Sequence, residues 1–315
     1  GMSNQIQALR HAVSRQTRMA SDLNGRVHSV FRHAVNFLME DDCFVTLMLS
    51  GKTLCPEGIV VSPDAFLRQT AGMLQLSADG LLPFKQGEVV CLKENWLLSK
   101  AFAIDLNGAE SVELSLSGCA VSDVVQQRLT QWLPEQLDEH GLLTGLRRDA
   151  CCDHENISAF REGLLETMSQ PDLDRAVRFE IFSRQLNQFI GLGEGLTPSG
   201  DDFLVGLLWA LWVGEADRLP GFATFLYAVQ STLHKTNDIS AQMLRFAIRK
   251  RFTEPLISLA RVSDPTDCAE AFKRIAAFGH TSGFDTLCGL LVGLKTTERI
   301  AYSFLKSAPT ASNHA

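Results

Sequence analysis

The sequence predicts an α+β protein in which a β-rich N-terminal part precedes an all-helical C-terminal part. Before about residue 120, short apolar runs alternate with turn residues, whereas beyond it apolar residues recur at helical spacing. The composition, 45% hydrophobic and 21% charged, is sufficient for a sizeable core. We therefore expect a β-rich domain over residues 1–120 and a helical domain over 121–306. The small, polar segment 307–315 is expected to form a disordered tail.

The expected strands are short and close together, which is typical of an antiparallel sheet or a small barrel. The Asn107-Gly108 dipeptide stands between two of these runs and predicts a hairpin turn. Segment 27–37 fits a strand and a helix equally well. The runs themselves cover residues 43–49, 58–61, 88–92, 100–106 and 112–116.

The second part shows a series of amphipathic stretches that predicts a helical bundle. Pro134 is expected to end the first helix, and Asn156 is a suitable N-cap for the second. Arg147 and Arg148 are expected to lie on a solvated helix face. The stretches cover residues 122–132, 157–168, 172–190, 203–213, 222–233, 241–250, 269–278 and 285–294.

Charge and apolar content exclude several classes of partner. The net charge of −7 argues against nucleic acid or an anionic membrane as the main partner. The longest apolar stretch, 203–214, is shorter than the roughly 20 residues that a membrane-spanning helix needs. No secretory signal is recognised, and the eight cysteines form no C-x-x-C pair. We therefore expect a cytoplasmic protein that binds neither nucleic acid nor membranes.

The most unusual segment is GLGEGLTPSGDDFLVG, residues 191–206. Its closely spaced glycines allow positive φ and a close approach of the backbone to a ligand. Thr197 or Ser199 can cap the helix that follows, with Pro198 in its first turn. The N–H groups at this helix start would then form a local anion site. The segment lacks the lysine of a phosphate-binding P-loop, and a flexible connector is the alternative interpretation.

The start of this helix is repeated later in the chain. SGDDFLVGLL at residues 199–208 matches SGFDTLCGLL at 282–291, and the shared Ser-Gly-x-Asp prefix makes the match specific. Gly206 and Gly289 lie inside the two helices, where glycine costs roughly 1 kcal/mol relative to alanine. We infer that the helices pack closely there and bring Asp202 and Asp285 to one site. Two such carboxylates should repel, so we expect either one protonated aspartate or a divalent ion such as Mg²⁺ between them.

Two further segments complete the predicted site. Asn237 and Ser240 precede another helix and are either its caps or a third wall of the pocket. His280, near a helix start, suits a hydrogen-bond donor or a base in its neutral form. The predicted catalytic residues are Asp202, Asp285 and His280, with Mg²⁺ possible at the two aspartates. The predicted substrate-binding residues are Gly193, Gly195, Thr197, Ser199, Gly200, Asp201, Asn237, Ser240, Thr281, Ser282 and Gly283.

The segments GLGEGLTPSGDDFLVG, TNDISAQML and GHTSGFDTLCGLL, with GRVHSVF near the N-terminus, resemble a bacterial family over residues 21–294. Its members look like the smallest subunit of oxamate carbamoyltransferase, an enzyme of anaerobic allantoin degradation with three kinds of subunit. The resemblance implies conversion of oxalurate and phosphate to oxamate and carbamoyl phosphate. It also implies the other subunits as partners and one of these small anions as substrate. The Ser-x-Arg-Thr-Arg segment of ordinary carbamoyltransferases is absent.

Three functions therefore remain open at the level of sequence. The leading hypothesis is a carbamoyltransferase component that binds an anionic substrate between the Ser199 and Ser282 helix starts. The first alternative is a non-catalytic subunit that acts as a scaffold or a sensor. The second alternative is a stand-alone Mg²⁺-dependent hydrolase or ligase that uses the two aspartates.

Overall fold

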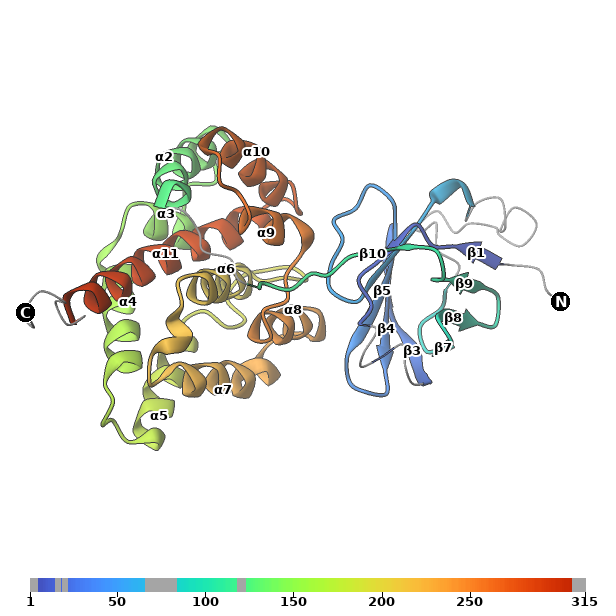
Figure 1. Ribbon diagram of the computed structural model, residues 1–315, viewed down its shortest axis with the longest axis horizontal. Coiled ribbons are helices and arrows are strands. Elements are labelled where there is room, and N and C mark those ends of the chain that lie inside the picture. Colours follow the sequence, from blue (N-terminus) through green and yellow to red (C-terminus); the bar gives the residue numbers. More distant parts are fainter. Residues whose placement is uncertain (1–4, 15–17, 19–21, 66–83, 118–122, 308–315) are drawn as a thin grey trace, which may run out of the picture. The chain divides into compact units, whose positions relative to one another are not determined.

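The computed structural model describes residues 5–14, 18, 22–65, 84–117 and 123–307. The chain divides into two compact units, residues 1–114 and 115–315. The first is a curled mixed sheet and the second is built of helices (Figure 1). The predicted α+β class is confirmed. The expected tail lies outside the described residues from 308 onward.

The N-terminal unit is one sheet whose described strands follow the order β1-β9-β8-β7-β3-β4-β5-β6-β2-β10. Alternating strand residues point into a single core that includes Phe37, Leu47 and Ile59, all fully buried. The strands are β1 (Gln5–Gln7), β2 (Arg10–His11), β3 (Leu23–Val30), β4 (Ala34–Met39), β5 (Phe44–Leu49), β6 (Gly58–Val61), β7 (Val89–Lys93), β8 (Trp96–Ser99), β9 (Ala103–Asp105) and β10 (Glu110–Ser111).

The sheet differs from the sequence prediction in its pairing. The pairs β1–β9, β2–β10 and β5–β6 are parallel, so the sheet is mixed rather than antiparallel. Asn107 and Gly108 do form a turn, but β9 and β10 pair with other strands and make no hairpin. Segment 112–116 is not a strand, because only Ser115 forms an isolated bridge, to Arg251. Alternating apolar residues predict that a segment is extended. They do not predict which strand that segment pairs with.

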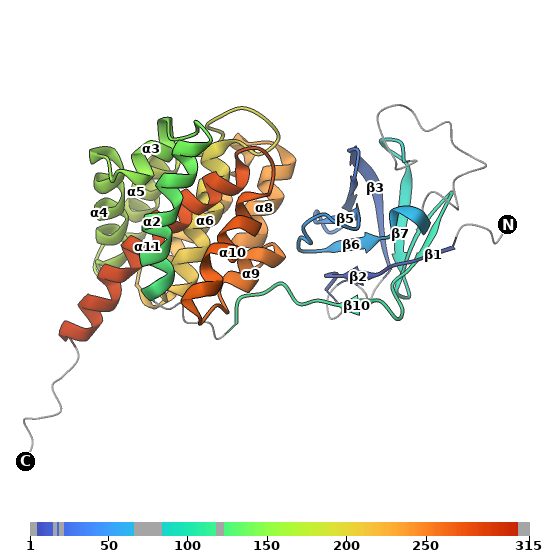
Figure 2. The same cartoon turned by 90° about the horizontal axis from the view of Figure 1, so that it is seen from above.

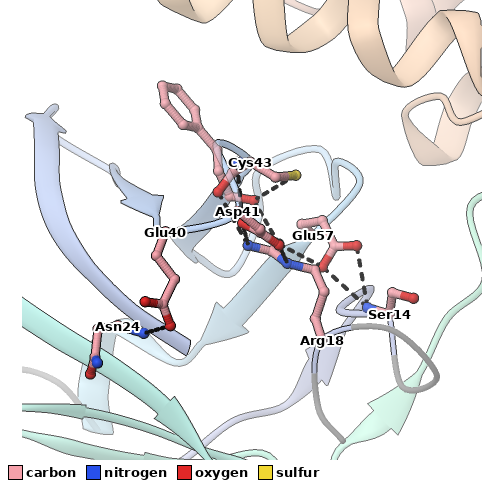
Figure 3. A network of polar contacts seen from close by, with 8 residues as sticks. Ser14, Arg18, Asn24, Glu40, Asp41, Cys43 and Glu57 are labelled. Atoms are coloured by element: carbon pink, nitrogen blue, oxygen red, sulfur yellow. Dashed lines mark hydrogen bonds and ion pairs between the residues drawn. The ribbon is translucent and has the colours of Figure 1, made fainter. Parts of the chain in front are cut away.

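A buried arginine holds together the turn before β5 and the chain before β6 (Figure 3). Arg18, with 4% of its surface exposed, donates from Nε and Nη2 to the Asp41 carboxylate at 2.8 and 3.0 Å. Its Nη1 donates to the Phe44 carbonyl at 3.0 Å and to Glu57 at 3.1 Å, and Nη2 donates to the Cys43 carbonyl. Hydrogen bonds on several sides offset the cost of burying these charges.

The C-terminal unit is a helical bundle, as predicted. Its helices are α2 (Asp123–Glu139), α3 (Gly145–Cys151), α4 (Glu155–Ser169), α5 (Arg175–Leu186), α6 (Ser199–Val213), α7 (Phe222–Thr232), α8 (Asp238–Ile248), α9 (Glu254–Leu259), α10 (Pro265–Ala276) and α11 (Ser282–Ser307), with short 3₁₀ turns η2 (Ala216–Arg218) and η3 (Leu233–Lys235).

Several predicted helix boundaries differ from those of the structure, and two of them have a direct physical explanation. Pro134 lies inside α2, because Leu133 and Leu137 continue its buried face past the proline and outweigh the lost hydrogen bond. His154, not Asn156, is the N-cap of α4, since its ring accepts a hydrogen bond from the Asn156 N–H at 3.2 Å. Capping depends on which side chain faces the free N–H groups, and residue type alone does not decide this.

Helix α6 lies in the interior of the helical unit with α11 beside it (Figures 1 and 2). Almost every residue of α6 is buried, including Phe203 and Trp209, which explains why its sequence is apolar on all sides. Among the described helices, none combines the length and apolar character needed to cross a bilayer. The buried apolar stretch at 203–213 forms the centre of the bundle.

Replacing Arg18 by Met should destabilise the N-terminal unit by about 3–5 kcal/mol, because it removes the guanidinium that offsets two buried or half-buried carboxylates. Hydrogen-exchange mass spectrometry should show faster exchange in β5 and β6. Arg184→Met is the matched control, since the exposed Arg184–Glu180 pair is worth at most about 0.5 kcal/mol. Unchanged exchange in β5 and β6 would show that the network does not hold these strands.

Candidate functional site

Glycines let α6 and α11 approach to backbone contact. A Cβ atom on Gly206 would lie 1.9 Å from the Thr286 carbonyl oxygen, and one on Gly289 would lie 1.8 Å from the Phe203 carbonyl oxygen. Thr286 and Phe203 hold equivalent positions, each four residues after the repeated serine. The predicted close packing at both glycines is therefore confirmed, and it is reciprocal.

The two helices run parallel and in register. Further along, Gly293 packs on Ala210, and Gly214 packs on Thr297. Both of these pairs have the same sequence separation as Ser199 and Ser282. Equivalent residues of the two copies therefore lie at the same level, and so do the two helix starts.

The helix starts meet through their hydroxyl groups. Thr197 Oγ1 and Ser282 Oγ share a hydrogen bond of 2.7 Å. These two hydroxyls lie beside Asp202 and lower its pKa, while the hydroxyls of Ser199 and Thr281 lower the pKa of Asp285. Each aspartate is thus supported by the serine of the other copy. We call the four half-buried residues Thr197, Ser199, Thr281 and Ser282 the hydroxyl ring.

Asp202 is fully buried, and neither of its carboxylate oxygens accepts a hydrogen bond from the part of the chain that the structure describes. Burial raises its pKa to about 8, and the nearby charges of Asp285 and Asp201 add to this rise. The Ser282 and Thr197 hydroxyls oppose the rise, although one of them donates to the other and neither meets an Asp202 oxygen in hydrogen-bonding geometry. Asp202 is therefore mainly protonated at neutral pH.

Asp285 is equally buried but has a counter-charge. Arg147 on α3 donates from Nη1 to Asp285 Oδ1 at 3.0 Å, while the second carboxylate oxygen has no hydrogen-bond partner among the described residues. Burial raises the pKa of Asp285, and the Arg147 guanidinium and the neighbouring hydroxyls oppose that rise. The two repeated aspartates consequently differ in charge environment, although their sequence contexts are alike.

The prediction that Arg147 lies on a solvated face is wrong. Its side chain is only 16% exposed, and Nε donates to the Leu142 carbonyl at 2.7 Å, which aims the guanidinium at Asp285. Arg147 is the site residue that sequence reasoning missed. Nothing in the Arg147-Arg148 doublet indicates a partner 138 positions away. Its neighbour Arg148 lies in the last turn of α3.

The glycine-rich loop folds over the start of α6. Gly191, Gly193 and Gly195 have φ values of 73°, 113° and 92°, where only glycine is free of strain. A Cβ atom on Gly193 would lie 2.8 Å from the Ser199 nitrogen, so this glycine permits the close approach. Residues 191–196 are exposed, so the loop forms the outer surface over the start of α6.

The N–H groups at the helix starts divide into satisfied and unsatisfied ones. Gly200 donates to the Leu192 carbonyl at 2.9 Å, and Gly283 donates to the Phe278 carbonyl at 3.0 Å. These two glycines, expected to bind substrate, instead pack their Cα atoms against the backbone of Phe189 and Ile275. The N–H groups of Ser199 and Ser282 have no hydrogen-bond partner in the described ranges.

Asp201 and the expected third wall hold the loop in place. The Asp201 carboxylate accepts from the Gly191 N–H at 2.8 Å and from the Thr236 hydroxyl. Asn237 caps α8 by accepting from the Ser240 N–H at 2.9 Å, and its Nδ2 donates to the Leu196 carbonyl at 2.8 Å. These three predicted binding residues therefore position the loop through hydrogen bonds of their own.

The remaining predicted groups lie at the edge of the site. His280 is exposed in the turn before α11, next to Thr281 of the hydroxyl ring. In the part of the chain that the structure describes, no cluster of three or more His, Cys, Asp or Glu side chains could hold a metal ion. Asp202 and Asp285 offer two carboxylates, one of which already faces Arg147. The site thus combines hydroxyl and N–H donors with one acid, Asp202, and one ion pair, Asp285–Arg147.

Comparison with known families assigns the chain to a family. The family model described as oxamate carbamoyltransferase subunit AllH matches residues 189–294, which include the glycine-rich loop, α6 and the start of α11. The model of the AllH family N-terminal domain matches residues 5–111, the mixed sheet. The chain belongs to the AllH family, a family of oxamate carbamoyltransferase subunits. No solved structure matches it.

The raised pKa of Asp202 predicts a pH-dependent effect of Asp202→Asn on stability. The folded protein holds a proton that the unfolded chain loses near the ordinary pKa of 3.8, so this group's stabilising contribution falls as pH rises toward about 8. Each unit of raised pKa corresponds to about 1.4 kcal/mol. The variant should therefore gain stability relative to the original protein across this window.

Urea unfolding at acidic and at mildly alkaline pH measures this effect. Asp201→Asn is the matched control, because the Asp201 carboxylate accepts two hydrogen bonds and its loss should destabilise the protein. A difference between Asp202→Asn and the original protein that stays constant with pH would show that Asp202 is ionised in the folded state.

Proposed function

We propose that this chain is a carbamoyltransferase component that binds an anionic substrate at the paired starts of α6 and α11. The reaction is the one implied by the family, oxalurate and phosphate giving oxamate and carbamoyl phosphate. The observation that carries the proposal is the reciprocal arrangement in which each repeated aspartate lies beside the serine hydroxyl of the other copy and the threonine hydroxyl of its own. The family match over residues 189–294 covers this arrangement.

The helix starts supply the groups that an oxyanion needs. The free N–H groups of Ser199 and Ser282 and the hydroxyl ring would donate to carboxylate or phosphate oxygens. Two parallel helices that begin at one level add their positive N-terminal potentials at this point. These donors would also stabilise the negative charge that develops on the carbamoyl oxygen during acyl transfer.

The two aspartates suit different parts of the chemistry. A phosphate oxygen attacks the carbamoyl carbon of oxalurate, the bond from that carbon to the oxamate nitrogen breaks, and the nitrogen takes up the proton that phosphate loses. Asp202, as a neutral acid, would keep its proton and donate a hydrogen bond within the site, and Asp285 would remain a carboxylate paired with Arg147. His280, at the exposed edge beside Thr281, would act as the base toward phosphate.

The other subunits of the complex are proposed as partners of this chain. A family named as a subunit implies an assembled enzyme. Exposed Leu192 and Leu196 lie in the loop over the start of α6. Because Asp285 already faces Arg147 and Asp202 is a neutral acid, the proposal places a proton rather than Mg²⁺ between the two carboxylates.

Replacing Ser199 or Ser282 by Ala should lower oxalurate phosphorolysis by the assembled enzyme at least about tenfold, since each change removes a donor worth roughly 1.4 kcal/mol or more. Release of carbamoyl phosphate measures the rate. Ser183→Ala is the matched control, because the Ser183 hydroxyl donates only to the Phe179 carbonyl within its own helix. Full activity of both site variants would contradict the proposal. Activity of the remaining subunits in the absence of this chain would show that the chain is a scaffold.

A further inference from the structure

Asp202 lies beside the hydroxyl ring without a hydrogen-bond partner among the described residues, and its protonation bears on ligand binding. We propose that the site binds one oxyanion together with one proton, and that Asp202 carries this proton. The inference rests on the proposed function for the location of the anion, and it adds the protonation state that recognition requires. Asp202 is then a positioning residue that acts through the hydroxyls of Thr197 and Ser282.

The evidence begins with burial. Both oxygens of Asp202 and Oδ2 of Asp285 are shielded from solvent and lack hydrogen-bond partners among the described residues. A buried carboxylate that accepts no hydrogen bond is costly in its ionised form. The neighbouring hydroxyls of Thr197 and Ser282 are half-buried, so they can reach both the acid and a ligand on the exposed side. A proton on Asp202 removes the charge from this buried carboxyl group.

The direction of the hydroxyl hydrogen bonds couples the protonation of Asp202 to anion binding. A hydroxyl group has one proton to donate and two lone pairs to accept with. If Asp202 were ionised, the adjacent hydroxyls would donate inward to it and present lone pairs outward, which repels an anion. If Asp202 is protonated, it donates to a hydroxyl, and that hydroxyl can donate outward to an oxyanion. The protonation of Asp202 therefore sets whether Thr197 and Ser282 attract or repel an anion.

The charged groups around Asp202 favour this assignment over Asp285. On α11, Asp285 faces the Arg147 guanidinium of α3 and keeps a counter-charge as a carboxylate. On α6, Asp201 is occupied by the Gly191 N–H and the Thr236 hydroxyl. His280 and Glu194 are exposed on the two loops. Asp202 is thus the acid without a counter-charge, and its pKa of about 8 places its titration near neutral pH.

Thermodynamic linkage turns this into a measurable effect. A bound oxyanion adds negative charge beside Asp202 and holds the proton more tightly, so binding takes up a proton whenever the free site lacks one. Below the pKa of Asp202 the proton is already present, and uptake is close to none. Above it, uptake approaches one proton, and the anion affinity falls about tenfold per pH unit.

Isothermal titration calorimetry of the full chain with oxamate tests the inference, because the oxamate carboxylate stays ionised throughout this range. Titrations in two buffers of different ionisation enthalpy give the number of protons taken up. We expect close to none at about pH 6 and close to one at about pH 9.5. Asp202→Asn should bind oxamate without proton uptake, since its amide is neutral and donates at every pH. His280→Gln should keep the uptake of the original protein.

The outcomes separate the two proposals. Oxamate binding with a pH-independent affinity and no proton uptake would overturn the inference and leave the proposed function standing. Proton uptake that survives in Asp202→Asn would also overturn it. Binding that needs added Mg²⁺ at about pH 9.5, without proton uptake, would assign the enclosed oxygens to a cation. No oxamate binding at any pH would contradict the anion site itself and hence both proposals.

Discussion

The backbone contact between α6 and α11 is the constraint on which the site depends. Gly206 and Gly289 leave no room for a Cβ atom, so the two helices meet at one fixed depth and register. Because the contact is reciprocal, the two repeated Ser-Gly-x-Asp segments begin at the same level. A shift of one helix by a single turn, about 5 Å, would separate Thr197 from Ser282 and remove the hydroxyl ring.

The two helix starts are built alike, but one residue from another helix gives their two aspartates different surroundings. Arg147 reaches Asp285 from α3 and no equivalent cation reaches Asp202 among its neighbours in the described structure. The same sequence motif therefore yields one carboxylate with a counter-charge and one neutral acid. Pairs of acidic groups with divergent pKa values divide acid and base roles in many enzymes. In this chain burial is the largest cause of both raised pKa values, and Arg147 lowers only that of Asp285.

The sequence predicted those features whose physical cause is local or repeated. Glycines inside apolar helices indicated close packing, and the Ser-Gly-x-Asp repeat indicated two equivalent helix starts. The pairing of β9 and β10 with other strands, and the position of Arg147, depend on residues distant in the chain, for which one sequence gives no signal. Asp201 and Asp202 are adjacent, yet Asp201 anchors a loop while Asp202 has no hydrogen-bond partner among the described residues, because helical geometry turns them to different neighbours.

The central claim is that the α6–α11 contact encloses a neutral acid at Asp202 beside an ion-paired carboxylate at Asp285. Carbon-13 NMR of the aspartate carboxyl groups, assigned with Asp202→Asn and Asp285→Asn, measures both titrations directly in the ligand-free chain. The account predicts that Asp202 titrates at about 8. Replacing Arg147 by Met should raise the pKa of Asp285, because its counter-charge is lost. An Asp202 carboxyl that titrates near the ordinary value of 3.8 would contradict the account.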